Sequence, residues 1–90
     1  PMTSVKGQIE TRLRESLNPE VLIVEDFSAE HAGHSGARAG GETHFRVHIA
    51  AEQLKGKASV AQHRAIHKPL RDMMPEPIHA LEITVLEKNE

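Results

Sequence analysis

The chain has 90 residues, no cysteine and a formal net charge of −2 at pH 7. We therefore expect one domain over residues 1–90, with Pro1 a cloning remnant, and we expect no disulfide, no thiolate metal ligand and no uniformly basic surface that coats nucleic acid. No apolar run approaches the roughly 18 residues of a membrane span, and no signal-peptide pattern opens the chain, which predicts a soluble cytoplasmic protein without membrane contact.

The first predicted element is a helix that is capped by Thr3 or Ser4 and stopped by Asn18-Pro19. Apolar residues recur at every fourth position between these signals and form one stripe: Val5, Ile9, Leu13 and Leu17. An apolar, β-branched run at 21–27 predicts a strand. Residues 28–41 are rich in glycine and lack periodicity, so they are interpreted as a long loop, which in a compact domain is usually functional or disordered.

Alternating polarity predicts the next strand, at 43–50. Its apolar face carries Phe45, Val47 and Ile49. Its other face is interpreted as solvated surface and carries three polar residues: His44, Arg46 and His48.

A short turn is expected at 52–54, then a helix at 59–74 and a last strand at 78–86. Pro69 removes one backbone hydrogen bond inside the helix and should kink or shorten it. The order of elements predicts an α+β fold, in which a small three-stranded mixed sheet packs on helices. The long crossover that carries the second helix favours a parallel pairing for the last strand.

Three groups of histidines are candidate metal ligands. His79 shares a strand face with apolar residues at the mouth of the last strand, where it is either a core-edge histidine bonded to a backbone carbonyl or a functional group. His31 and His34 lie in the glycine-rich loop, which is either mobile or able to present an imidazole to iron. His63 and His67 are one helical turn apart, but no acidic residue within that turn completes a metal site, so a surface role is favoured.

A basic stretch is the second candidate site. Residues 55–71 contain no Asp or Glu and carry five cationic side chains: Lys55, Lys57, Arg64, Lys68 and Arg71. These cations could contact DNA phosphates or an acidic partner, or they could form a solvated helix face. Because the stretch has no aromatic residue to stack on single-stranded bases, contacts to a duplex backbone would be the more credible mode of DNA binding.

Five short motifs occur in one order and spacing: Gly33-His34, Glu42-Thr-His-Phe-Arg-Val47, Leu54-Lys-Gly-Lys57, Gln62-His-Arg64 and Pro77-Ile-His-Ala-Leu81. Over roughly residues 9–85 this set resembles the BolA family. The resemblance implies an αββααβ fold related to the KH domain. It also implies a role without catalysis, and the chain itself offers neither a cysteine nucleophile nor a Gly-x-Ser-x-Gly motif.

The resemblance further implies a metal-related function. His79 matches a histidine that ligates iron, and the second ligand comes from the loop at the position of His34, with His31 as a rival. A monothiol glutaredoxin and its glutathione would supply the remaining ligands, so that a [2Fe–2S] cluster is shared by the two proteins and the isolated chain holds none. The expected role is then iron–sulfur cluster trafficking or the regulation of iron homeostasis.

Bacterial members of the BolA family suggest an alternative, a DNA-binding transcriptional regulator that uses the basic stretch together with His63. Four positions depart from the family pattern: Leu54 replaces phenylalanine, Ala58 replaces serine, Gln62 replaces arginine, and Pro69 is unusual in this helix. These changes remove one positive charge and a helix cap, which weakens the DNA prediction more than the cluster prediction. A third interpretation is an interaction module that binds a partner without metal.

Overall fold

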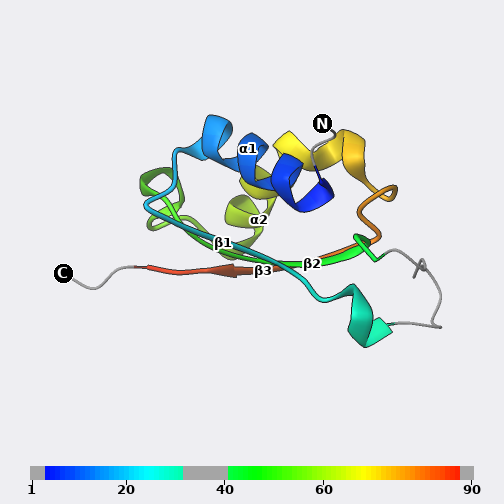
Figure 1. The fold of residues 1–90 in the computed structure, drawn as a ribbon. Coiled ribbons are helices and arrows are strands. Elements are labelled where there is room, and N and C mark those ends of the chain that lie inside the picture. The colour runs from blue at the N-terminus through cyan, green and yellow to red at the C-terminus, as the bar shows by residue number, and fades with distance from the viewer. Residues whose placement is uncertain (1–3, 32–40, 88–90) are drawn as a thin grey trace.

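The computed structural model describes residues 4–31 and 41–87. Its elements, in chain order, are α1 (Val5–Leu17), β1 (Val21–Asp26), the 3₁₀ turn η1 (Ser28–His31), β2 (His44–Ala50), the 3₁₀ turn η2 (Glu52–Leu54), α2 (Ser59–His67), the 3₁₀ turn η3 (Lys68–Met73) and β3 (Ala80–Val85). Figure 1 shows α1 and α2 together on one side of the sheet. The α+β fold predicted from the sequence is confirmed.

The sheet has the order β1-β2-β3, with β1 antiparallel and β3 parallel to β2. The predicted mixed sheet and parallel last strand are therefore correct. The central strand turns Phe45, Val47 and Ile49 toward the helices, and all three are fully buried. Because β1 ends where β2 and β3 begin, one end of the sheet gathers three chain segments, on the right in Figure 1.

Helix α1 begins and ends as its sequence predicts. The side chain of Ser4 accepts a hydrogen bond from the Gly7 N–H at 3.0 Å and caps the first turn. Asn18 adopts the left-handed conformation that ends many helices. The buried face of α1, made of Ile9, Leu13 and Leu17, packs into the core. Within the described residues, no helix is long and apolar enough to cross a membrane.

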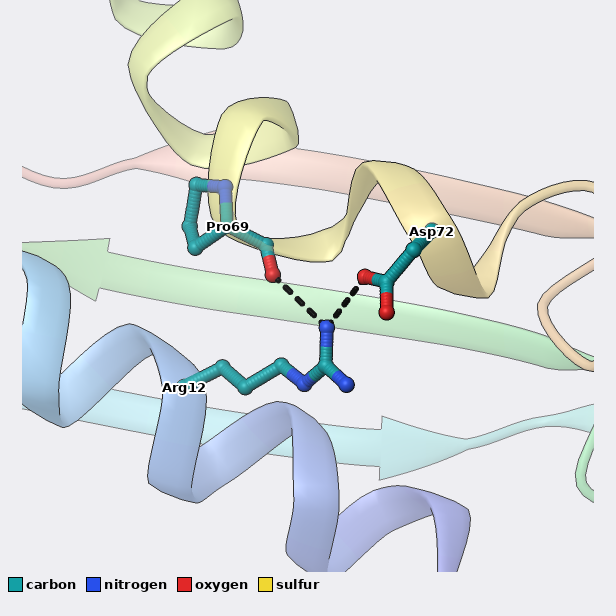
Figure 2. A network of polar contacts seen from close by, with 3 residues as sticks. All are labelled: Arg12, Pro69 and Asp72. Atoms are coloured by element: carbon teal, nitrogen blue, oxygen red, sulfur yellow. Dashed lines mark hydrogen bonds and ion pairs between the residues drawn. The ribbon is translucent and has the colours of Figure 1, made fainter.

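The second predicted helix is shorter than expected, because α2 ends at His67 and the chain continues as η3. Pro69 lies at the start of this tighter turn, since it has no N–H to continue the α-helical bonding. Arg12 of α1 fixes the new direction: it donates to the Pro69 carbonyl at 3.1 Å and pairs with Asp72 (Figure 2). The hydrogen bond from Arg12 holds the pKa of Asp72 below its ordinary value.

Several predicted strand boundaries need correction at the end of the sheet where β1 stops and β2 and β3 begin. The first strand stops at Asp26 rather than at residue 27, and residues 28–31 form η1 instead of irregular loop. The Asp26 carboxylate accepts the Ser28 N–H at 2.9 Å, a side-chain bond that turns the backbone out of the strand. Strands β2 and β3 likewise begin one and two residues later than predicted, at His44 and Ala80.

Candidate functional site

Hydrogen bonds at the start of β2 join the end of β1, the turn η1 and the segment that precedes β3. The Ser28 hydroxyl oxygen accepts the N–H groups of Thr43 at 2.9 Å and of His44 at 3.0 Å. On the same side, Asp26 accepts the N–H of Ser28 and, at 3.1 Å, that of Glu42. These bonds close the base of the glycine-rich loop, since they join the residues just before it to the residues just after it.

Asp26 stays ionised in this arrangement. Its partial burial opposes the charge, but hydrogen bonds from the hydroxyl and the N–H of Ser28 and from the N–H of Glu42 outweigh that cost. The nearby His44 acts in the same direction. The net result is a pKa below the ordinary value of the carboxyl, so Asp26 is a stable anion at neutral pH.

Helix α1 is connected to the same region through Glu42. Its carboxylate oxygen accepts the Val5 N–H at 2.7 Å, which satisfies one of the unpaired donors of the first helical turn. Glu42 and the preceding Gly41 both have positive φ angles, 63° and 73°, which turn the chain into β2. The return of the loop is thus anchored to both α1 and the sheet.

His79 lies on the other side of the start of β2. The N–H groups of His79 and Ala80 both donate to the Thr43 carbonyl, at 2.8 and 3.1 Å. The sequence placed His79 on the apolar strand face at the rim of the core, and that prediction is wrong. The residue precedes β3 and its side chain is exposed, while the neighbouring Ile78 is the buried residue.

His44 was expected on a solvated face and is instead 3 % exposed. Its ring lies 5.4 Å from the ring of His79, centroid to centroid, with the planes inclined by 53°. Phe27 contacts the His44 ring edge-on at a centroid distance of 5.9 Å, and the Nδ1 atom of His44 lies 2.8 Å from the Thr43 hydroxyl. The neighbouring rings at the end of the sheet thus help to bury a face that is half-exposed farther along β2, at Arg46 and His48.

The other histidines predicted as candidate metal ligands do not form a described site. His34 lies outside the described residues, and the backbone of His31 ends η1. His63 is exposed on α2, where His67 is half-buried. In the ranges 4–31 and 41–87 no group of three or more His, Asp or Glu side chains is arranged to hold a metal ion.

The basic stretch forms an exposed surface along the turn that follows η2, along α2 and along η3. All the residues predicted for it are exposed: Lys55, Lys57, His63, Arg64, Lys68 and Arg71. Lys55 pairs with Glu52 of η2 at 3.2 Å, and Val60 is an exposed apolar residue on α2. Gln62 does not face solvent: it is buried and donates to the Leu54 carbonyl at 2.8 Å, so this departure from the family pattern serves packing.

Comparison with known proteins identifies relatives over most of the chain. The family model described as "BolA-like protein" matches residues 13–90. SufE-like protein 1 of Arabidopsis thaliana, named chloroplastic/mitochondrial, is 40 % identical over 80 residues, which cover 84 % of this chain and 22 % of that protein. The DNA-binding transcriptional regulator BolA of Vibrio cholerae is 34 % identical over 79 residues, covering 88 % of this chain and 71 % of that protein.

A solved structure agrees with these matches. The BolA domain of SufE1 from Arabidopsis thaliana superposes with a TM-score of 0.82 at 37 % identity, and the alignment covers 97 % of this chain and 95 % of that one. The chain thus spans about a fifth of SufE-like protein 1 but nearly all of its BolA domain. Because that relative is named for organelles, the cytoplasmic location expected from the sequence stays a prediction.

Proposed function

Because the chain belongs to the BolA-like protein family, we propose that it pairs with a monothiol glutaredoxin and shares a [2Fe–2S] cluster with it. His79 would donate one nitrogen to the cluster, and His34 a second one, with His31 as the rival loop ligand. The glutaredoxin and its glutathione would supply the sulfur ligands that a chain without cysteine cannot. The role is iron–sulfur cluster trafficking or the regulation of iron homeostasis, without catalysis by this chain.

The observation that carries the proposal is the position of His79. Its imidazole is exposed, and its backbone N–H is bonded to Thr43, where the glycine-rich loop returns to the sheet. The chain from His34 to Thr43 reaches up to roughly 30 Å when extended, so its length does not prevent the loop histidine from approaching His79. An exposed imidazole close to the point where the chain rejoins the sheet fits a donor to iron that a partner can reach.

Reconstitution tests this function. The chain is mixed with a monothiol glutaredoxin, glutathione, iron and sulfide, and the expected product is a heterodimer whose visible spectrum indicates mixed Cys and His ligation. His79→Ala should abolish that spectrum, and His34→Ala should weaken it more than His31→Ala does. The exposed His63→Ala variant on α2 is the matched control and should behave as the wild type. An unchanged complex and spectrum in His79→Ala would rule the proposal out.

DNA binding is a second candidate, favoured by the exposed cations of the basic surface and by the name of the Vibrio cholerae relative. It predicts retention of duplex DNA with an affinity that falls steeply as salt rises, with a slope of about 0.9 per phosphate neutralised. Lys68→Gln and Arg71→Gln should each reduce that slope, whereas His79→Ala should not change it. No retardation at low salt, or a flat salt response, would remove this candidate.

A further inference from the structure

We propose that His44 and His79 together bind a divalent first-row transition-metal ion, such as Zn²⁺, in this chain alone, with water completing the coordination. The site shares His79 with the proposed cluster but needs no glutaredoxin, glutathione or loop histidine. It would give the isolated chain a metal affinity of its own, and an ion bound there would compete with cluster assembly for His79.

The separation of the two rings fits one shared ion. Imidazole nitrogens bind Zn²⁺ at about 2.0–2.1 Å with tetrahedral geometry, which places the centroids of two ligating rings roughly 5 Å apart. The centroids of His44 and His79 are 5.4 Å apart. Their planes are inclined by 53°, so the rings are not stacked face to face. The proposed site requires the exposed ring of His79 to rotate until one nitrogen of each ring points at the same ion.

His44 is the fixed member of the pair. Its ring is almost fully buried, and its Nδ1 atom lies 2.8 Å from the Thr43 hydroxyl. The Thr43 hydroxyl also lies 3.3 Å from the Ser28 oxygen. In the proposed site this hydroxyl accepts a hydrogen bond from Nδ1–H of His44, which leaves the lone pair of the ring on Nε2. A second hydrogen bond of this kind orients histidine ligands in metal sites and fixes their tautomer.

His79 is the adjustable member. Its backbone is held by the bond to Thr43, but its side chain is exposed and can rotate toward an arriving ion. Imidazole suits zinc, copper, nickel and iron rather than magnesium or calcium. With two protein ligands the site is a weak one, whose other positions stay open to water or to a third donor.

The competing pair is His63 and His67 on α2, one helical turn apart, and the experiment must separate the two. The untagged chain is titrated with Zn²⁺ by calorimetry and with Co²⁺ by visible absorption, in the absence of glutaredoxin and glutathione. We expect one site, with affinity lowered at least tenfold by His79→Ala. His63→Ala and His48→Ala are the controls and should bind as the wild type does.

A substitution at Thr43 tests the site without replacing the buried His44. Thr43→Val keeps the shape of this fully buried residue but removes the bond to Nδ1, and it should weaken Zn²⁺ binding by roughly 10–100-fold in a chain that circular dichroism shows to be folded. Long-range ¹H–¹⁵N spectra should find the lone pair of His44 on Nε2 and its loss on adding Zn²⁺. Wild-type affinity in His79→Ala, or a proton on Nε2 throughout, overturns the proposal.

The outcome is separable from that of the cluster proposal. Replacement of both loop histidines, His31→Ala with His34→Ala, should leave Zn²⁺ binding unchanged, and its loss would overturn the two-histidine site. If Zn²⁺ binds as expected while no cluster forms with a glutaredoxin, the proposed function alone fails. If the cluster forms while the chain takes up no Zn²⁺, the two-histidine site alone fails.

Discussion

At the scale of single residues, the hydroxyl of Ser28 joins the two ends of the glycine-rich loop. It accepts two backbone N–H groups from the start of β2 and is itself buried. Ser28→Ala leaves both donors without this acceptor, which should cost about 1–3 kcal/mol of the free energy of unfolding. Urea titration followed by circular dichroism measures the loss. Ser59→Ala, at an exposed helical position, should change the stability by less than about 0.5 kcal/mol.

Asp26 makes stability depend on acid pH. Because its pKa is lower in the folded state than the 3.8 of the free group, the unfolded chain takes up the proton first as pH falls. The stability that Asp26 contributes is therefore complete above about pH 5 and is lost as the pH falls through the lowered pKa.

Comparing wild type with Asp26→Asn isolates this contribution, because the second depressed carboxyl, Asp72, is present in both. The variant should be less stable by about 1 kcal/mol at pH 7, the worth of a typical hydrogen bond to a partly exposed group. The difference should shrink as the pH falls through the lowered pKa of Asp26. A difference that does not shrink as the pH falls below 3.8 would contradict this account of Asp26.

The turn at Asp26 and Ser28 could have been predicted from the sequence by a pattern other than strand periodicity. Asp26-Phe-Ser28 is a pattern in which an aspartate accepts an N–H two residues on, which predicts a turn. The burial of His44 had no such signal. Alternation placed it correctly on the face away from the helices, but its burial depends on Phe27 and His79, which the register of the sheet brings beside it.

At the scale of the elements, the two α-helices differ in their N-caps. Ser4 caps α1 with its side chain, whereas Ala58 stands at the N-cap of α2 with extended backbone and no side-chain bond. Ala58→Ser should raise stability by about 0.5–2 kcal/mol, and Ser4→Ala should lower it by a similar amount. In a domain of this size 1 kcal/mol shifts Tm by about 4–8 °C, so thermal melts resolve both changes.

The elements themselves follow from periodicity and proline. The four-residue stripe predicted α1, alternation predicted β2, and Pro69 predicted an interrupted second helix; all three are confirmed. The ends of β1 and β3 were misplaced by one or two residues. Those ends are set by hydrogen bonds between distant segments, such as the bond from His79 N–H to the Thr43 carbonyl, which no local pattern encodes.

At the scale of the whole molecule, the topology determines where a site can form. A crossover through α2 and η3 makes β3 parallel to β2, so β3 begins where β2 begins and where β1 ends. The length of this connection was visible in the sequence and predicted the parallel pairing. The meeting of His44 and His79 needed the register as well, in which Ala80 lies opposite His44.

One cluster of buried side chains supports this arrangement, and among the described residues its aromatic member is Phe45. Ile66 of α2 belongs to this core and is fully buried, whereas Val60 on the same helix is 62 % exposed. Ile66→Ala removes buried methyl and methylene groups and leaves a cavity, so it should cost about 2–5 kcal/mol. That is a large share of the roughly 5–13 kcal/mol expected for a domain of this size.

If helices and sheet unfold as one unit, Ile66→Ala must weaken both by the same free energy. Circular dichroism reports the helices in urea, and hydrogen exchange at the β2 amides reports the sheet. The urea dependence of the free energy should stay unchanged, since the same surface is exposed on unfolding. Val60→Ala is the matched control and should shift neither probe by more than about 0.5 kcal/mol. A loss confined to the helical signal would show that the sheet folds apart from α2, against a single domain.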